Sequence, residues 1–424
     1  MKACSVCHRL FKDEGSLCPV HGDRLVATTE LTPPADPQDS RMGKTVCRGR
    51  YQIWRKVADG GMGRVYQAVD IQSNRCVALK ILHPEVASDP VSLERFKREF
   101  AVSSSLPHDH IVEVIAFEET EDKSYALAME YLEGEELRTV LKRDKVLPPE
   151  RLIRMISQVA MGLAAAHEHE IVHRDLKPDN IFLCHTDDGD NVKILDFGSV
   201  RDNSQGAKKL TVMGTTIGSP FYMSPEQAQG LEELDHRADV WSLAAIAYES
   251  LTGRIPFEGG TGPAILLAIM TGVLQPPSEV GKAHDVPRTL DPVMDEALAK
   301  SPKNRTVTIG ALADRIGAAY GLMGSHQEWA KMPEKELGDQ IRTALPAALE
   351  GLDKASRIDL VAMDQAFKSD EAFMAGSIGG PVLTPTPSDV LAPSPAREIP
   401  KWIIPVVAGV AVILGIVMTL LFAR

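Results

Sequence analysis

Two short polar strings and one lysine carry residue types that handle phosphate groups and divalent cations. IVHRDLKPDN contains Asp175, Lys177 and Asn180, ILDFGSV contains Asp196, and VALK ends in Lys80. Carboxylate and amide oxygens are the hard ligands that Mg²⁺ demands. Phosphoryl transfer needs charge neutralisation and in-line alignment more than covalent participation by the protein. These residue types therefore suit phosphate chemistry.

A glycine-rich stretch, VADGGMGRVY, raises the question whether it can cover the phosphates of a nucleotide. Loops that do so usually read G-x-G-x-x-G-x-V. Here Ala58, Gly60, Gly63 and Val65 occupy those places, so alanine replaces the first glycine. Glycine clusters alone more often form plain turns. Other motifs in the chain must therefore show whether this loop covers a nucleotide.

The order of these strings along the chain is typical of one family. VALK at 77–80 is followed by IVHRDLKPDN at 171–180, ILDFGSV at 194–200 and GSPFYMSPEQ at 218–227. Over roughly residues 51–320 the sequence resembles the protein kinase family, most closely the bacterial branch of eukaryotic-type serine/threonine kinases. The resemblance implies an α+β fold, with a β-rich N-lobe hinged to a helical C-lobe. It also implies transfer of the ATP γ-phosphate to serine and threonine hydroxyls of protein substrates.

The resemblance assigns a role to each polar residue. Asp175 matches the base that accepts the proton of the substrate hydroxyl. Lys177 matches the lysine that steadies the γ-phosphate and favours serine/threonine over tyrosine. Asn180 and Asp196 match the ligands of Mg²⁺ (or Mn²⁺), and Lys80 matches the lysine that contacts the α- and β-phosphates.

The helix partner of Lys80 is a choice between two acidic residues. Glu99 is preferred, because its RF-x-RE pattern stands just before SLPHDHIV, and Glu94 is the competitor. The alternative for the whole set is a pseudokinase that keeps the fold as a membrane scaffold without transfer. The presence of Lys80 together with Asp175 and both metal ligands favours an active enzyme.

The nucleotide site is expected to combine the glycine loop with a hinge that follows Met129, the gatekeeper. The GGMG form is common in this bacterial branch, and we expect Ala58 to stiffen the loop without abolishing binding. The predicted ATP-binding residues are Val57, Ala58, Asp59, Gly60, Gly61, Met62, Gly63, Arg64, Val65, Lys80, Glu99, Glu130 and Leu132. Of these, Glu130 and Leu132 are expected to meet the adenine through backbone groups.

Activation-loop phosphorylation is expected, because an arginine before the catalytic aspartate, here Arg174, commonly receives a phosphate. The enzyme is expected to phosphorylate this loop itself. Ser219 matches the residue that orients the substrate hydroxyl, and Glu226 with Arg305 matches a structural ion pair in the large lobe. The predicted phosphosites are Thr211, Thr215 and Thr216.

The N-terminal string CSVCHRLFKDEGSLCPVHG predicts a structural zinc site. Cys4, Cys7, Cys18 and His21 form two knuckles, and four such ligands suit tetrahedral Zn²⁺. A segment of about 25 residues cannot build a core, so metal would supply most of its folding free energy. It resembles the small zinc ribbons found ahead of some bacterial kinases. The alternatives are a disordered tail with incidental cysteines, and His8 in place of His21.

Composition narrows the classes of partner and the cellular compartment that can be expected. The net charge of −12 over 424 residues disfavours nucleic acid as a partner, and with it a zinc-ribbon nucleic-acid adaptor. The N-terminus lacks the apolar stretch of a signal peptide, which predicts a reduced, cytosolic compartment. Cys76 and Cys184 lie in apolar runs, where buried thiols are expected.

Apolar periodicity predicts the order of the elements. Residues 51–82 alternate apolar and polar, which indicates strands. From residue 92 onward apolar residues recur at helical spacing, and 151–167 and 239–252 predict buried helices. The Pro- and Asp-rich stretch at 28–42 predicts a linker.

The C-terminal stretch WIIPVVAGVAVILGIVMTLLF at 402–422 carries no charge. As a helix it spans about 31 Å, close to the hydrocarbon core of a bilayer, so a single-pass anchor is preferred over a buried core helix. The kinase would then lie on the cytoplasmic side of the cell membrane, and Ala411 with Gly415 could support a homodimer. The expected layout is a zinc ribbon at 1–25, a linker at 26–50, a kinase domain at 51–320, a charged helical region without assigned role at 321–376, a Pro/Ser-rich linker at 377–400 and the anchor at 401–424.

Overall fold

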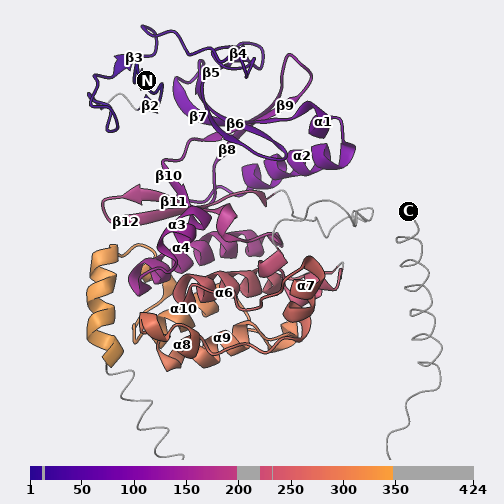
Figure 1. Cartoon of the computed structure of the whole chain (residues 1–424), viewed down its shortest axis with the longest axis vertical. Helices are drawn as coiled ribbons and strands as arrows, with labels where there is room; N and C mark the ends of the chain where they lie inside the picture. Colours follow the sequence, from indigo (N-terminus) through magenta and orange to yellow (C-terminus); the bar gives the residue numbers. More distant parts are fainter. Residues whose placement is uncertain (12–14, 198–219, 232, 347–424) are drawn as a thin grey trace, which may run out of the picture. The chain divides into compact units, whose positions relative to one another are not determined.

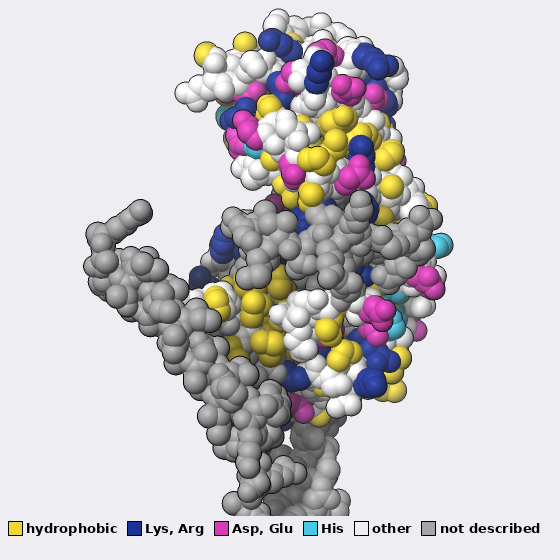
Figure 2. Space-filling view, turned by 90° about the vertical axis from the view of Figure 1, so that its right-hand side faces the viewer, with side chains coloured by type: hydrophobic (Ala, Val, Ile, Leu, Met, Phe, Trp, Pro, Cys, Tyr) yellow, Lys and Arg dark blue, Asp and Glu magenta, His cyan; other side chains and the backbone are white. Residues whose placement is uncertain are grey.

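The computed structural model describes residues 1–11, 15–197, 220–231 and 233–346. Ser219, the three predicted phosphosites and the predicted anchor lie outside these residues. Within the described part, no helix combines the length and apolarity that a bilayer crossing needs. On the face drawn in Figure 2, basic and acidic side chains are interspersed over the upper part of the coloured surface.

An antiparallel sheet of six strands, in the order β4-β5-β6-β7-β9-β8, forms the upper lobe (Figure 1). In β7, RCVALKIL, apolar residues on alternate positions face the core, and Val77, Leu79 and Ile81 are fully buried there. Two helices accompany the sheet, α1 (Pro84–Ala87) and α2 (Pro90–Ser105). The strands are β4 (Thr45–Val46), β5 (Tyr51–Asp59), β6 (Gly63–Asp70), β7 (Arg75–Leu82), β8 (Val114–Glu119) and β9 (Tyr125–Glu130).

The expected strands at 51–82 are confirmed as β5, β6 and β7, and the helical pattern from residue 92 is confirmed for α2. After α2 the prediction of further helix is wrong, because the chain forms strands β8 and β9, which complete the sheet. In β9, YALAME, Ala126, Leu127 and Ala128 are buried on both faces of the strand. A short run that is apolar on both faces has the same pattern in a strand and in a helix.

The N-terminal segment forms a separate small sheet in the order β2-β1-β3, made of β1 (Lys2–Ala3), β2 (Leu10–Phe11) and β3 (Val26–Ala27). Two strands therefore fall inside residues 26–50, which the sequence assigned to a linker. β3 pairs with β1, and β4 pairs with β5 at the edge of the large sheet. Asp39 in the same stretch is only 2% exposed. The Pro- and Asp-rich sequence showed no sign of these two strands, because pairing with β1 and β5 stabilises them and their local sequence does not.

The lower lobe is helical around α4 and α6, which confirms the two predicted buried helices. In α6 almost every residue is buried, including Trp241, which explains an apolar sequence without a polar face. The α-helices are α3 (Leu137–Asp144), α4 (Pro149–Glu168), α5 (Pro225–Ala228), α6 (Arg237–Thr252), α7 (Gly262–Thr271), α8 (Pro277–Val280), α9 (Asp291–Ala297), α10 (Ile309–Ala319) and α11 (His326–Trp329).

Shorter elements join the two lobes and the helices. A sheet in the order β10-β11-β12 lies at the top of the lower lobe (Figure 1), with strands β10 (Gly134–Glu136), β11 (Ile181–Thr186) and β12 (Gly189–Ile194). The 3₁₀ turns are η1 (Pro178–Asn180), η3 (Pro220–Tyr222), η4 (Lys282–His284), η5 (Arg288–Leu290) and η6 (Pro302–Asn304).

The first part of the charged region after residue 320 belongs to the core of the lower lobe. Trp329, Leu337 and Ile341 are buried in the same apolar cluster as α4 and α6, and residues 334–346 are helical (the orange helix of Figure 1). Gln158 of α4 donates to the Ala330 carbonyl at 3.0 Å. These contacts, invisible in local sequence, tie the region to the lobe.

Candidate active site

A lysine–glutamate ion pair joins β7 to α2. Lys80 Nζ donates to both carboxylate oxygens of Glu99, at 3.0 and 2.9 Å. On α2, Glu99 shares the buried face with Phe96, because residues three apart lie on one side of a helix. Glu94 lies on another face and pairs with Lys97. The two glutamate side chains are 9% and 65% exposed, respectively, so only Glu99 is placed to position Lys80.

The charges around this pair are unbalanced. Burial opposes the charged form of Lys80, but the Glu99 and Asp196 carboxylates outweigh it and raise the pKa of Lys80. Burial raises the pKa of Glu99 against the attraction of Lys80, and Asp196 adds to the rise. One lysine therefore faces two carboxylates. A divalent cation on Asp196 would relieve this repulsion, so the donor set fits Mg²⁺.

The catalytic string folds into a loop whose polar ends point at one another. Lys177 Nζ lies 2.6 Å from Asp175 Oδ2, and Asn180 Nδ2 donates to the Asp175 carbonyl at 2.8 Å. Because that bond uses the amide nitrogen, the side-chain oxygen of Asn180 is left to face a cation. Arg174 and Asp196 have φ of 67° and 58°. Such left-handed backbone is uncommon outside glycine and clusters at functional sites.

A buried aspartate that the sequence reasoning missed holds this loop. Asp239 on α6 is fully buried and accepts from the backbone N–H groups of His173 and Arg174, each at 2.9 Å. His167 Nε2 lies 2.8 Å from the same carboxylate. The signal was available, since Asp239 is the one acidic residue in the largely apolar string ADVWSLAAIAY. His167 and His173 therefore both have structural partners.

His173 also connects the loop to Phe197. Its Nε2 lies 3.0 Å from the Leu195 carbonyl oxygen, and its ring centroid is 4.8 Å from that of the fully buried Phe197. Asp196 lies between these two contacts in the chain. Its position next to Lys80 and Glu99 is thus fixed from both sides.

The glycine loop closes a tight hairpin between β5 and β6. Ala58 lies in β5 opposite Val65, in extended backbone that alanine adopts readily, so replacing the first glycine does not strain the loop. A Cβ at Gly63 would lie 2.2 Å from the Ile81 carbonyl oxygen. Close approach to β7 therefore requires this glycine, whereas the resemblance had attributed it to phosphate contact. A Cβ at Gly60 would make only an ordinary van der Waals contact, 3.6 Å from the Gly63 carbonyl oxygen.

A cavity of about 300 Å³ lies between the glycine hairpin, the hinge and the catalytic loop. Of the predicted ATP-binding residues, it is lined by Val57, Ala58, Val65, Lys80, Glu99, Glu130 and Leu132, together with Met129 and the metal-ligand candidates Asn180 and Asp196. The hairpin tip (Asp59 to Arg64) does not line it. Sequence reasoning missed Ala78, Val112, Phe182 and Leu195, whose apolar side chains give no motif, and also the polar lining residues Tyr131, Glu136 and Asp179. The Glu130 N–H donates to the Glu113 carbonyl at 2.9 Å, so a nucleobase contact from Glu130 would use its carbonyl.

A buried ion pair anchors the lower lobe beneath the site. Arg305 donates to both oxygens of Glu226, at 2.5 and 2.6 Å, which is the pair that the sequence predicted. The next residue, Gln227, donates through Nε2 to the Arg174 carbonyl at 2.6 Å. The anchor is therefore connected directly to the catalytic loop.

The sequence model of the protein kinase domain matches residues 51–315. The chain belongs to the protein kinase family. It is 34% identical over 283 residues to the serine/threonine-protein kinase pkn3 of Myxococcus xanthus, which covers 66% of this chain and 51% of the relative. It is 36% identical to the serine/threonine-protein kinase PrkC of Bacillus subtilis, over 66% of this chain and 42% of the relative.

The chain thus spans about half the length, or less, of these curated relatives. The crystal structure of the Mycobacterium tuberculosis PknI kinase domain is similar, with a TM-score of 0.51 and 27% identity over 66% of this chain and 98% of that one. The predicted two-lobed kinase fold is confirmed, and the enzyme class of the domain is serine/threonine protein kinase.

Ahead of the kinase domain, the four predicted zinc ligands come together. The ligand atoms of Cys4, Cys7, Cys18 and His21 all lie within 4.8 Å of one another, and His8 is not among them. Burial raises the pKa of the Cys18 thiol, but hydrogen bonds from the backbone and ring of His21 outweigh it and lower that pKa to about 6. The donor set and its spacing fit a tetrahedral metal ion.

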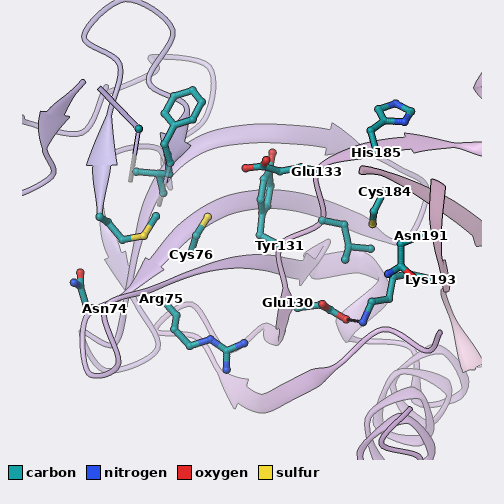
Figure 3. A pocket seen from close by; sticks show the side chains of 15 residues that line it. Asn74, Arg75, Cys76, Glu130, Tyr131, Glu133, Cys184, His185, Asn191 and Lys193 are labelled. Atoms are coloured by element: carbon teal, nitrogen blue, oxygen red, sulfur yellow. Dashed lines mark hydrogen bonds and ion pairs between the residues drawn. The ribbon is translucent and has the colours of Figure 1, made fainter. Parts of the chain in front are cut away.

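The expectation of buried thiols at Cys76 and Cys184 needs correction. Both are only partly buried, and they line a cavity of about 720 Å³ beside the hinge of the kinase domain (Figure 3). Figure 3 also shows Lys193 joined to Glu130 at this cavity, at 2.6 Å. The apolar strings concealed the exposure because each strand has one face turned to the cavity.

We predict that Asp239→Asn lowers the free energy of unfolding by about 1–3 kcal/mol at pH 7, because two buried N–H donors lose a charged acceptor. Burial raises the pKa of Asp239, but His167 and the backbone donors outweigh it and lower that pKa. The stabilisation is therefore complete above the unfolded-state pKa of about 3.9 and is lost as the pH falls through the lower folded-state value.

Denaturant titrations of both proteins at neutral and acidic pH measure this difference. Asp187→Asn, at an exposed position of the β11–β12 turn, is the control and should leave stability unchanged. A difference between wild type and Asp239→Asn that is the same size at both pH values would contradict the charged role of Asp239.

Proposed function

We propose that the chain is an ATP-dependent serine/threonine protein kinase that transfers the γ-phosphate to protein hydroxyls. The observation that carries the proposal is the Lys80–Glu99 pair at 2.9 Å with Asp196 beside it. In protein kinases this pair and the metal-binding aspartate must both be in place for transfer. A pseudokinase scaffold is not favoured, because the full set is present and assembled.

Each residue of the site has a task that follows from its contacts. A bound ATP·Mg²⁺ supplies the transferable phosphoryl group. Lys80, held by Glu99, binds its phosphates, and Asn180 with Asp196 would hold the metal. Asp175 engages Lys177 through Oδ2, which leaves Oδ1 to orient and accept the proton of a serine or threonine hydroxyl. Lys177, fixed at the same carboxylate, lies where it can offset charge on the phosphoryl oxygens.

We predict that Asp175→Asn lowers phosphotransfer by about 10²–10⁴-fold, because the proton acceptor is lost, and that Lys80→Met is similarly impaired while both stay folded. Autophosphorylation with labelled ATP and Mg²⁺ measures this. Asp187→Asn, the exposed control, should keep wild-type transfer. Transfer near the wild-type rate in Lys80→Met, or none in the wild type under any condition, would contradict the proposal.

We further infer that the kinase phosphorylates its own activation loop at Thr211, Thr215 or Thr216. Support comes from the position of Arg174, directly before the catalytic aspartate and bonded through its backbone to Asp239 and Gln227. Peptide mapping of the autophosphorylated protein identifies the acceptors.

We also propose that residues 1–25 hold a structural Zn²⁺ through Cys4, Cys7, Cys18 and His21. Support comes from ligand atoms that lie within 4.8 Å of one another and from the small size of the three-stranded sheet around them, which buries few side chains of its own. Metal would then contribute much of the stability of this segment.

We predict one zinc ion per chain in the full-length protein, and its loss in the double variant Cys4→Ser, Cys18→Ser. Cys47→Ser serves as the matched control, because Cys47 is buried but lies in the upper lobe of the kinase domain. Elemental analysis of the purified proteins gives the content. Zinc-free wild type prepared under reducing conditions with zinc present would overturn the site.

We infer a layout in which a linker at 377–400 joins the kinase to a single membrane anchor at 401–424, with the kinase in the cytoplasm and a homodimer formed through Ala411 and Gly415. Support is the uncharged stretch at 402–422 and the basic residues Arg397 and Lys401 on its N-terminal flank, which follow the positive-inside bias.

We predict that the full-length protein pellets with membranes and resists carbonate extraction, because its apolar stretch is long enough to span the bilayer. A chain ending at Pro400 should stay in the supernatant. Fractionation of both decides the point. Equal behaviour of the two would rule out the anchor.

A further inference from the structure

The N-terminal segment and the kinase domain share a buried interface at strand β6. The Leu10 N–H donates to Gln67 Oε1, and Gln67 Nε2 donates to the Leu10 carbonyl, both at 3.3 Å. Gln67 is 1% exposed. Leu10 and Ala3 pack with Trp54 and Val69 of the kinase sheet in one apolar cluster. The segment is therefore attached through side chains that are fully removed from water.

A bulge in β5 places the largest of these side chains under the segment. The pairing of β5 with β6 shifts register between Ile53 and Arg55, which re-aims the residue between them. Ile53 and Trp54 are consecutive, point to opposite faces, and are both fully buried. An antiparallel sheet usually leaves one face to water. Here the N-terminal segment covers the part of that face around Trp54.

Residues after the small sheet hold β6 from its other face. Asp39 is 2% exposed and accepts from the Tyr66 hydroxyl at 2.9 Å. Arg64 lies 3.4 Å from the same carboxylate and also donates to Asp59 at 2.8 Å. Arg64 and Asp59 flank the glycine loop, so the contact of Asp39 reaches the loop itself.

The Leu10 contact lies on the same face of the sheet as the nucleotide cavity. In β6, Val65 lines that cavity, and Gln67, two residues on, points to the same face and bonds Leu10. Gln67 pairs with Ala78, another cavity residue. Arg55 opposite Gln67 donates to the hydroxyl of Tyr131 in the hinge at 3.1 Å, and Figure 3 shows Tyr131 beside the cavity that Leu10 also lines.

We propose that residues 1–46 act as a clamp on the β5–β6 hairpin, and that the metal state of the Cys/His cluster sets the affinity of the kinase for ATP. The proposal rests on the proposed zinc site and nucleotide site. Loss of metal unfolds the small sheet, withdraws Leu10 from Gln67 and exposes Trp54. The hairpin then opens locally more often, and ATP must order it on binding, which weakens affinity.

The test compares zinc-loaded full-length protein with the same protein stripped by a chelator and returned to Mg²⁺ buffer. A non-hydrolysable ATP analogue with Mg²⁺ is the probe, by calorimetry, and hydrogen exchange is followed in 51–59 and 63–70. Leu10→Ala removes the apolar packing of this side chain on Trp54 and Val69, while its backbone bonds to Gln67 and all four ligands remain. Val6→Ala, on a side chain 55% exposed between two ligands, is the matched control.

Stripping and Leu10→Ala should each raise the Kd of the analogue about tenfold and speed exchange in both strands, as a coupling of typical size would. Exchange in α6 should stay slow, which shows that the kinase core is folded. Val6→Ala should match wild type. Unchanged Kd and exchange after verified zinc loss would overturn the clamp. If Kd and exchange change as expected but the protein shows no phosphotransfer, the result would contradict the proposed function and still support the clamp.

Discussion

A lysine ammonium and a glutamate carboxylate meet in the interior of the upper lobe, and the site depends on that contact. Removing two charges from water is expensive, so such a pair persists only where the surrounding elements fix it. Here β7 fixes Lys80 through the buried neighbours Leu79 and Ile81, and α2 fixes Glu99 through a face that packs on the sheet. Asp196 adds a second carboxylate, which leaves an excess of negative charge that a divalent cation would balance.

The lower lobe fixes the position of the catalytic loop. A loop that carries left-handed Arg174 needs external support for its backbone donors. Asp239 supplies it from the buried helix α6, and Gln227 supplies an additional bond from the segment anchored by the Glu226–Arg305 pair. The reactive side chains are thus carried by a loop while their positions are determined by buried helices.

Much of the kinase domain could be predicted from sequence because its chemistry demands particular residue types in a fixed order. Lys80, Asp175, Asn180 and Asp196 belong to such strings, and Glu99 followed from its local pattern. The apolar walls of the cavity, such as Ala78 and Leu195, could not be predicted, since any residue of suitable size serves there.

Structure that depends on distant partners also gave no local signal. β8 and β9 have sequences that suit a helix equally well, and β4 forms only because β5 offers an edge. The burial of Trp329 against α10 is likewise set by Gly317, where a Cβ would lie 2.1 Å from the indole. Local sequence indicates which residues are apolar, but tertiary contacts decide what they pack against.

Glu99, and not Glu94, positions Lys80 for phosphate binding, and two acid-to-amide changes on α2 test this role. Glu99→Gln keeps the size of the side chain but removes the charge that holds Lys80, so steady-state phosphotransfer should fall by about 10²-fold or more. Glu94→Gln removes an equal charge from the exposed face of α2 and should leave the rate unchanged. Equal rates in the two variants would show that Glu99 does not position Lys80.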